Sequence, residues 1–357
     1  MRVDLGLPPV RQPTPAGRPE HPGLVDRFAR QARDLRVSVT DRCTLRCGYC
    51  MPAEGLAWMP ESALLTDDEL IRLIRLAVRE LGITKVRFTG GEPLLRRSLE
   101  TVVAATAELT TQIGRPVGTA VTTNGLSLAH RAQSLAAAGL GRVNVSLDTL
   151  DPDRFESITR RRRLDDVLAG IAAAHQAGLT PVKVNAVLVR GVNDDEAVDL
   201  LDWALANGHE LRFIEAMPLD AQGQWRRDQV VPADETLAAL SHRYRLAALP
   251  GRGAAPAQAY EVRDAAGRLR GRVGVIASVT RPFCADCDRT RLTADGQVRN
   301  CLFARAETDL RALLRDGADD DQLADAWRGD AWAKAAGHGI DEAGFVPPER
   351  PMSAIGG

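Results

Sequence analysis

The sequence lacks several features that would place it in common classes of protein. Its 357 residues carry a formal net charge of −1, whereas a general nucleic-acid binder would carry a basic excess. No apolar run approaches the roughly 18 residues of a membrane span, and the N-terminus shows no apolar signal-peptide core. We therefore expect a cytoplasmic protein that binds neither nucleic acid nor membrane.

Cysteine is scarce, and its six copies are confined to two clusters. A disulfide framework would scatter them more evenly, and disulfides are rare in a reducing cytoplasm. The clustering therefore indicates metal binding at two places in the chain. The clusters are Cys43, Cys47 and Cys50, called the first triad, and Cys284, Cys287 and Cys301, called the second triad.

The first triad has the spacing CxxxCxxC and directly follows a predicted strand. Three thiolates in one short loop can bind three irons of a 4Fe–4S cluster, which usually takes four cysteines. The fourth iron would then be open to a small molecule. A structural zinc site is the alternative for either triad, although zinc usually takes paired CxxC or Cys/His sets and neither triad has a fourth ligand with such spacing.

Strand and helix patterns alternate from residue 35 to about residue 215, and six βα units predict a parallel sheet or an open barrel. Glycines follow four of the predicted helices, as is usual at helix ends. A short helix over residues 25–33 is predicted to lead into the first strand. The predicted strands are 35–40, 85–89, 117–122, 142–147, 182–188 and 211–215, and the helices between them are 67–81, 99–109, 128–138, 165–177 and 194–206.

Several of these strands alternate polar and apolar residues, although a parallel sheet covered on both faces should be nearly all apolar. Arg36, Arg87 and Lys183 each fall on the polar side of their strand. With a side-chain period of two, each strand would turn its apolar face to the helices and its polar face to a lumen. A lumen lined by several cations predicts an anionic ligand.

The pattern changes after about residue 250, which predicts three parts of the chain. Residues 1–25 are rich in Pro, Gly and Arg and are expected to be disordered. Residues 26–250 would form the barrel core, and residues 251–357 a smaller domain with the second triad. In that domain we predict strands over 259–263 and 273–276, a hairpin of 291–293 with 297–299 around an Asp-Gly turn, and helices over 309–315 and 320–334.

Two further motifs accompany the triads. Gly90 and Gly91 follow the second predicted strand, where glycines allow a ligand to approach the backbone closely. Arg289 and Arg291 follow Cys287 and could hold phosphate in bidentate fashion. This combination resembles the GTP 3′,8-cyclase family of radical S-adenosylmethionine enzymes, which performs the first step of molybdenum-cofactor biosynthesis. The matching motifs are LRVSVTDRCTLRCGYCMP, KVRFTGGEPLLR, AVTTNG, VNVSLDTL, KVNAVL, LRFIEAMP, FCADCDRTRLTADG and the terminal Gly-Gly.

The resemblance implies an α/β fold, an incomplete (β/α)6 TIM-type barrel of the radical S-adenosylmethionine kind, with a smaller C-terminal α+β domain. It implies a 4Fe–4S cluster on each triad and S-adenosylmethionine as a further cofactor. By the resemblance, Tyr49, Gly91, Ser146 and Met217 would contact S-adenosylmethionine. Likewise, Arg36, Arg87, Thr122, Lys183, Arg289, Thr290 and Arg291 would bind GTP, and Arg289, Arg291, Gly356 and Gly357 would take catalytic roles.

The implied reaction is a radical cyclisation. A 5′-deoxyadenosyl radical would remove the hydrogen at C3′ of GTP, and C3′ would attack C8 of guanine. An external electron donor and a downstream cyclic pyranopterin monophosphate synthase are the implied partners, and the sequence leaves monomer and homodimer open. The alternatives are another twin-cluster radical enzyme acting on a peptide or nucleotide, and a non-catalytic electron-transfer or zinc protein.

Overall fold

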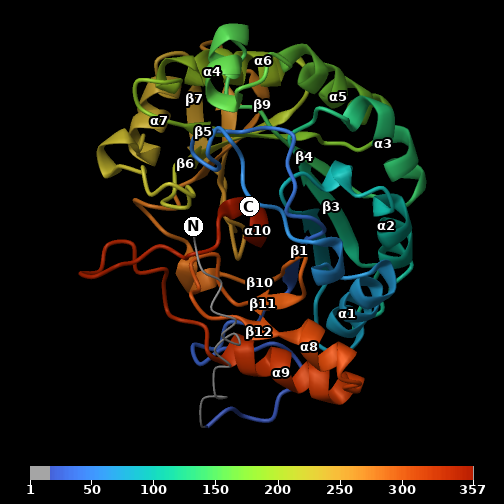
Figure 1. The fold of residues 1–357 in the computed structure, drawn as a ribbon. Helices are drawn as coiled ribbons and strands as arrows, with labels where there is room; N and C mark the ends of the chain where they lie inside the picture. Colours follow the sequence, from blue (N-terminus) through green and yellow to red (C-terminus); the bar gives the residue numbers. More distant parts are fainter. Residues whose placement is uncertain (1–16, 357) are drawn as a thin grey trace.

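The computed structural model describes residues 17–356, so the disorder predicted for residues 1–16 and the position of Gly357 lie outside the described residues. A single curved sheet of 12 strands surrounds a lumen, and helices cover its outer side (Figure 1). The strands follow the order β12-β11-β10-β1-β2-β3-β4-β5-β6-β9-β8-β7.

The central part of the sheet consists of consecutive parallel strands. They match the six predicted strands, with ends that differ from the prediction by at most two residues. The incomplete (β/α)6 barrel is therefore confirmed. The central strands are β1 (Asp34–Ser38), β2 (Lys85–Thr89), β3 (Gly118–Thr123), β4 (Val143–Ser146), β5 (Lys183–Leu188) and β6 (Glu210–Glu215).

The later strands extend both edges of this barrel instead of forming a separate sheet. β10 pairs in parallel with β1, and β9 pairs in parallel with β6. The proposed division at residue 250 therefore does not separate two sheets. The later strands are β7 (Arg245–Ala248), β8 (Gln258–Arg263), β9 (Leu269–Ile276), β10 (Arg289–Leu292), β11 (Gln297–Arg299) and β12 (Thr308–Asp309).

The helices predicted between the strands are present. α1 starts with a capping box, in which the Glu69 amide donates to Thr66 Oγ1 and the Thr66 amide donates to Glu69 Oε2. Three helices were not predicted, namely α4, α7 and α10. The helices are α1 (Asp67–Arg79), α2 (Leu99–Ala107), α3 (Leu128–Ala137), α4 (Pro152–Thr159), α5 (Leu164–Gln176), α6 (Ala197–Ala206), α7 (Ala233–Ser241), α8 (Leu310–Arg315), α9 (Asp320–Trp332) and α10 (Met352–Ile355), with short 3₁₀ turns between some of them.

The helix predicted over residues 25–33 is wrong. The Asp26 carboxylate accepts hydrogen bonds from the amides of Phe28 and Arg30, which forms a turn in which Ala29 has a φ of 61°. Residues 17–25 also differ from the predicted disorder. Leu24 is buried, and its amide donates to the Leu81 carbonyl over 3.3 Å.

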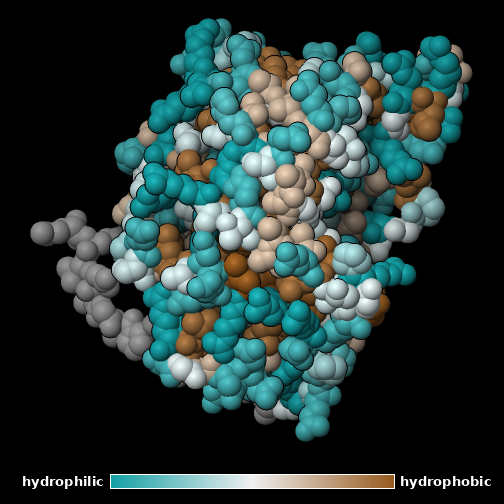
Figure 2. Space-filling model, turned by 90° about the vertical axis from the view of Figure 1, so that its right-hand side faces the viewer, coloured by the Kyte–Doolittle hydropathy of each residue, from teal (hydrophilic) through white to brown (hydrophobic). Residues whose placement is uncertain are grey.

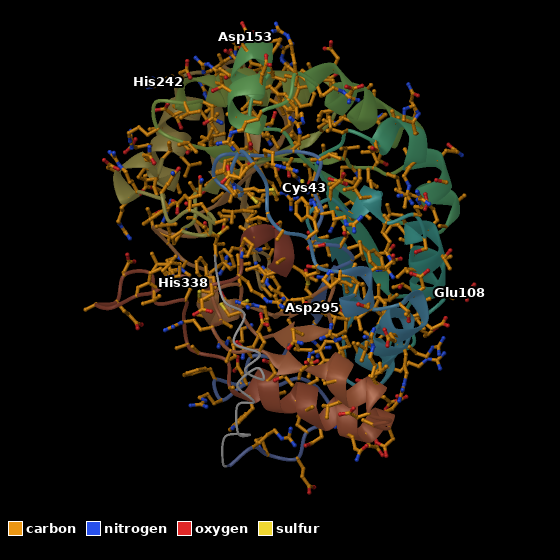
Figure 3. The ribbon with its side chains drawn as sticks, viewed as in Figure 1. Cys43, Glu108, Asp153, His242, Asp295 and His338 are labelled. Carbon is orange, nitrogen blue, oxygen red and sulfur yellow. The ribbon has the colours of Figure 1, made fainter. Side chains whose placement is uncertain are left out.

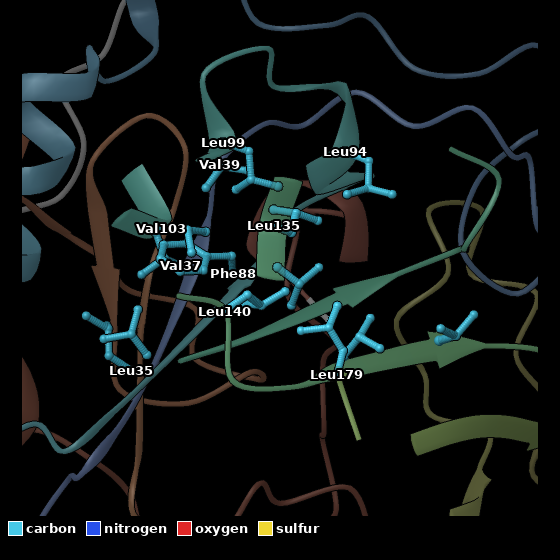
Figure 4. Packing of buried hydrophobic residues seen from close by; sticks show 14 of the residues in the cluster. Leu35, Val37, Val39, Phe88, Leu94, Leu99, Val103, Leu135, Leu140 and Leu179 are labelled. Atoms are coloured by element: carbon cyan, nitrogen blue, oxygen red, sulfur yellow. The ribbon is translucent and has the colours of Figure 1, made fainter. Parts of the chain in front are cut away.

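The core lies between the apolar strand faces and the surrounding helices (Figure 4). Leu35, Val37 and Phe88 are fully buried on the helix side of β1 and β2. Burial of one such side chain contributes roughly 1.5–3 kcal/mol, so these rows hold the helices against the sheet. The polar residues of the same strands must then face the lumen.

The outer surface contrasts with the core. Figure 2 shows one side of the molecule, where hydrophilic residues cover most of the surface and hydrophobic residues lie between them in small groups. None of the helices formed by residues 17–356 has the length and apolar character needed to cross a membrane.

Trp327 of α9 offers a test of this packing. Its side chain is fully buried, and its Nε1 donates to Thr290 Oγ1 of β10 over 3.1 Å. We expect Trp327→Ala to lower the free energy of unfolding by about 3–5 kcal/mol, because the change removes a buried indole and leaves a cavity. Urea denaturation of the anaerobically purified protein measures this loss. Trp332→Ala, at a half-buried position of the same helix, should cost clearly less, and equal losses would contradict the packing described.

Candidate active site

The first triad lies in the loop that follows β1, and Figure 3 places Cys43 near the centre of the barrel. Its three cysteines are unpaired and partly exposed. Burial raises the pKa of all three thiols, to about 12 for Cys50, and neighbouring thiolates and carboxylates raise it further. Three such thiolates need positive charge close by, and bound iron supplies it. The chemistry of this loop therefore fits a metal cluster.

No three His, Cys, Asp or Glu side chains among residues 17–356 are arranged to hold one metal ion. In a 4Fe–4S cluster each cysteine binds its own iron, so the thiolates need not converge on one point. The assignment of clusters to the two triads therefore rests on the number and chemistry of the thiols.

The first-triad loop is held by the end of α4. The amides of Arg46 and Gly48 donate to the carbonyls of Thr159 and Ile158, each over 3.0 Å. Arg160 closes the contact, because its Nη1 donates to the carbonyls of Arg46, at 2.6 Å, and Met51, at 3.1 Å. Arg160 belongs to a run of four arginines that gives no sequence signal for such a role. The loop is thus fixed by a helix that sequence patterns did not predict.

Gly90 and Gly91 place the end of β2 against the start of the first-triad loop. A Cβ at Gly91 would lie 2.3 Å from the Arg42 carbonyl oxygen, and one at Gly90 would lie 2.3 Å from the Thr40 carbonyl oxygen. These positions require glycine for a reason besides the predicted approach of a ligand, which stays a prediction. The space that a side chain would need is taken by the protein's own backbone.

Glu92 links the same turn to β3 and to the first triad. Its buried carboxylate accepts hydrogen bonds from Thr123 Oγ1 and from the Asn124 amide, both over 2.7 Å. Burial raises the pKa of this carboxyl. Asn124 Nδ2 in turn donates to Thr44 Oγ1 over 3.0 Å and lies 3.8 Å from Cys43 Sγ. Asn124 lies in a motif quoted for the resemblance, but the sequence gave no reason to place it beside a cysteine.

A cavity beside the first triad is called the Tyr49 cavity. Tyr49 donates its hydroxyl hydrogen to Asp148 Oδ2 over 2.6 Å, and burial raises the pKa of Asp148 to about 6. Met217 lines this cavity and also the next one, so it lies between them. Ser146, the last residue of β4, is half-buried and does not line either cavity. The other lining residues of the Tyr49 cavity include Gly48, Val187, Asn193 and Trp225.

The second cavity, called the arginine cavity, occupies the lumen between the central strands and the second triad. Arg36 of β1 is in register with Arg87 of β2 and with Arg291 of β10. Three guanidinium groups from adjacent strands therefore line the lumen side by side, as the two-residue period predicted. Arg212, Arg289, Thr122, Asn144 and all three cysteines of the second triad complete this part of the lining.

The arginine cavity contains more positive charge than the described residues neutralise, although Asp34 forms an ion pair with Arg87 over 3.9 Å. The buried Nε atoms of Arg36, Arg87, Arg212 and Arg289 find no hydrogen-bond partner within residues 17–356. Burial lowers the pKa of Arg36, and repulsion from Arg291, Arg289 and Arg87 lowers it further. Burying a charged group without a partner costs several kcal/mol. The cavity is therefore suited to a ligand with several negative charges.

The structure brings most of the predicted GTP contacts together, but not all of them. Arg36, Arg87, Thr122, Arg289 and Arg291 line the arginine cavity. The Thr290 side chain is on the opposite face of β10, because successive residues of a strand alternate, and its hydroxyl accepts a hydrogen bond from Trp327. The Thr290 side chain therefore does not line the arginine cavity, and the predicted contact of this residue with GTP stays a prediction.

Lys183 was expected to be a free cation in the lumen, and the structure differs from this expectation. Its ammonium forms an ion pair with Glu210, which lies directly across on β6, and it is absent from the lining of the arginine cavity. Arg212, two residues further along β6, lines the cavity instead, and its Nη2 donates to Asn144 Oδ1 over 2.9 Å. The two-residue period of residues 210–214 could have identified Arg212.

The C-terminal segment enters the lumen, and Figure 1 shows α10 near the centre of the barrel. Gly356 is buried with a φ of 75°, and a Cβ there would lie 2.5 Å from Ser38 Oγ. Its carbonyl accepts a hydrogen bond from Arg291 Nη1. Within α10, the backbone of Ser353 lies near the Cys50 thiol. The segment therefore contacts both the first triad and the arginine row.

Comparison with known families agrees with this arrangement. Residues 37–204 match the Radical SAM superfamily, and residues 209–340 match the family described as Molybdenum Cofactor Synthesis C. Among solved structures, the fold resembles that of Streptococcus suis SuiB bound to S-adenosylmethionine. The TM-score is 0.54 and the identity 15%, over 84% of this chain and 68% of the other. This likeness supports the barrel fold alone.

Curated relatives match at much higher identity. A GTP 3′,8-cyclase of Mycobacterium sp. (strain KMS) is 60% identical over 99% of both chains. One from Corynebacterium glutamicum is 58% identical over 94% of this chain and 89% of the relative, and one from Mycolicibacterium smegmatis is 57% identical over 99% of both. On this similarity, which extends over nearly the whole length, the chain belongs to the GTP 3′,8-cyclase family.

Proposed function

We propose that this protein converts GTP to (8S)-3′,8-cyclo-7,8-dihydroguanosine 5′-triphosphate, the first step of molybdenum-cofactor biosynthesis. Membership of the family supports this activity. The observation that carries the proposal is the row of Arg36, Arg87 and Arg291 in the lumen between two cysteine triads. This row is suited to a polyanionic substrate, and the triads lie on either side of it.

The first and second triads would each hold a 4Fe–4S cluster with one iron free of protein ligands. Tyr49, Gly91, Ser146 and Met217 are proposed to contact S-adenosylmethionine at the first cluster, with Met217 placed between both cavities. When bound, the first cluster and S-adenosylmethionine supply the radical that removes hydrogen from C3′ of GTP.

The residues of the arginine cavity would bind and orient the substrate. Arg36, Arg87 and Arg289 offer buried N–H groups that lack partners, and phosphate oxygens accept such bonds well. Arg212 and Thr122 line the same cavity. Lys183 remains a proposed contact, which requires its ammonium to exchange Glu210 for a phosphate. A substrate bound in this way would keep its two reacting atoms, C3′ and C8, in one geometry. Such positioning accounts for a large part of the rate of enzymatic reactions.

The C-terminal segment would complete and seal the site. The Gly356 carbonyl holds Arg291, and the nearby Ser38 and Thr89 leave no room for a side chain at this position. A backbone carbonyl bonded to a guanidinium group fixes its orientation while leaving other N–H groups for the substrate. A filled lumen also keeps water and other reactants away from a radical.

The reaction also requires partners. One electron would come from an external donor, and the product would pass to a downstream cyclic pyranopterin monophosphate synthase. The protein would act as a monomer or a homodimer in the cytoplasm.

The test of this function is anaerobic incubation with GTP, S-adenosylmethionine and a strong reductant, followed by mass analysis of the products. We expect 5′-deoxyadenosine, methionine and the cyclised nucleotide to accumulate together. Cleavage of S-adenosylmethionine with GTP left intact would instead favour another twin-cluster radical enzyme, which acts on a peptide or a different nucleotide. Zinc without iron in the purified protein would favour the non-catalytic alternative.

The two triads should have separable roles. Reconstituted protein should contain about eight irons per chain, since each cubane holds four. Replacing the first triad by Ala should halve the iron and abolish cleavage of S-adenosylmethionine. Replacing the second triad should halve the iron but leave some cleavage without cyclised GTP. Iron analysis and product analysis on the same preparations measure both effects, and normal cyclisation by the second variant would refute the substrate role of that triad.

Arg289 should bind the triphosphate rather than the base. We expect Arg289→Met to weaken GTP binding by about 1.5–3 kcal/mol, the usual value of a hydrogen bond to a charged group. Guanosine binding should change little, because guanosine has no phosphate. Calorimetry with both ligands measures the difference. Arg270→Met, at an exposed position of β9, is the control and should bind GTP normally. Equal losses for GTP and guanosine would contradict the assignment.

The C-terminal glycines should matter for cyclisation more than for folding. Deleting Gly356 and Gly357 removes the carbonyl that holds Arg291 but few apolar contacts. We expect iron content and GTP binding to remain largely intact while cyclisation falls by at least about 100-fold, as for a misplaced reacting group. Product formation and iron content are measured on one truncated preparation. Full activity after truncation would show that the bond from Arg291 to Gly356 is dispensable.

A further inference from the structure

Two buried cations hold the turn that carries Cys284 and Cys287. Arg30 Nη1 donates to the Cys284 carbonyl over 2.7 Å and to the Ala336 carbonyl over 2.8 Å. Lys334, which lines the same small cavity as Arg30, contacts Cys287. The turn of the second triad is thus fixed by residues that lie far from it in the sequence.

Lys334 makes three contacts, which matches the three N–H groups of its ammonium. Its Nζ donates to the Arg289 carbonyl over 2.9 Å, to the Cys287 carbonyl over 3.2 Å and to Cys287 Sγ over 3.4 Å. The residue is only 6% exposed. One ammonium group therefore connects a cysteine of the second triad with the backbone of an arginine proposed to bind substrate.

Arg30 and Lys334 differ in whether a carboxylate neutralises their charge. Arg30 is paired with the Asp26 carboxylate at 2.5 Å, so its charge is largely neutralised. Lys334 forms no ion pair with any residue from 17 to 356 within salt-bridge distance. Asp330, one turn earlier on α9, is buried near it, and burial raises the pKa of that carboxyl to about 7. Lys334 therefore presents much of its positive charge to Cys287.

The charged side chains near the sulfurs are mostly negative at the first triad and positive at the second. Glu92 lies near Cys43, Asp148 near Cys47 and Asp220 near Cys50, so each sulfur of the first triad has a carboxylate close by. Arg46 also lies near Cys43, and Arg160 is bonded to backbone carbonyls of the same loop. Around Cys287 the charged neighbours are Arg289 and Lys334, and the Lys334 ammonium lies 3.4 Å from the Cys287 sulfur.

This difference bears on electron transfer. The reduction potential of an iron–sulfur cluster depends on nearby charge and on hydrogen bonds to its sulfurs. A cation and an N–H donor stabilise the reduced cluster, because it carries one more negative charge, whereas carboxylates destabilise it. A lower potential at the first triad suits the reductive cleavage of S-adenosylmethionine. A higher potential at the second triad would keep that cluster from competing as a reductant.

We propose that Lys334 is a positioning residue that orients Cys287 and raises the reduction potential of the second cluster above that of the first. The proposal rests on the two clusters assigned under the proposed function. Its geometric basis is the set of bonds from one buried ammonium to Cys287 Sγ and to the carbonyls of Cys287 and Arg289.

The experiment is an anaerobic redox titration of both clusters, followed by electron paramagnetic resonance. Lys334→Met removes the charge and the donors while keeping a similar length, and Lys334→Gln keeps a neutral donor. We expect Lys334→Met to lower the ratio of reduced to oxidised second cluster about tenfold at a given applied potential. This corresponds to a fall of about 59 mV in the reduction potential of the second cluster, for transfer of one electron. Lys334→Gln should give a smaller shift, and the first cluster should titrate as in the wild type.

Arg328→Met is the matched control, because Arg328 lies on the same helix and donates outward to the Pro22 carbonyl. This variant should leave both potentials unchanged. An unchanged second-cluster potential in Lys334→Met with full iron content would overturn the inference. Loss of the second cluster in both Lys334 variants would do so as well, since Lys334 would then be needed only for cluster retention. About four irons in the wild-type protein would instead refute the two-cluster assignment itself.

Discussion

The constraint on which the rest of the structure depends is the crowding of guanidinium groups in one lumen. Arg36, Arg87 and Arg291 occupy adjacent strands in register, and burial and repulsion from neighbouring arginines lower the pKa of each. A folded chain tolerates such charge only when other packing compensates for its cost. The compensation comes from the opposite faces of the same strands, where Leu35, Val37 and Phe88 are fully buried under the helices. The apolar face of these strands thus stabilises the fold, while the opposite face presents positive charge that suits an anion.

The closing of the lumen requires elements from the two ends of the chain. β10 pairs with β1, so Arg291 joins a row that begins in the first strand of the barrel. The C-terminal segment then enters the lumen, where the Gly356 carbonyl holds Arg291 and the backbone of Ser353 lies near Cys50. A site assembled from such distant segments can exclude solvent only in the folded chain, which suits chemistry that must be kept from water.

The two cysteine triads are supported by different means, and the difference has a chemical consequence. The first-triad loop is fixed by neutral backbone carbonyls of α4 and by Arg160, and carboxylates surround its sulfurs. The turn of the second triad is fixed by Arg30 and Lys334, and its sulfurs lie near cations. Two similar sets of thiols can therefore hold clusters with different electron affinities, because the surrounding charge differs.

Local patterns in the sequence determined the strands, most helices, the two triads and the polar face of the lumen. These features depend on residue periodicity and spacing, which act over a few neighbouring positions. The tertiary structure alone decided which cations line the arginine cavity. Lys183 and Arg212 lie on the same kind of strand face, but Glu210 lies across from Lys183 and pairs with it, while Arg212 reaches the cavity. It also decided the roles of Arg160, Asn124 and Lys334, because each acts through contacts with residues more than 40 positions away in the chain. Such contacts leave no periodic trace in the sequence, since they depend on how distant elements pack against one another.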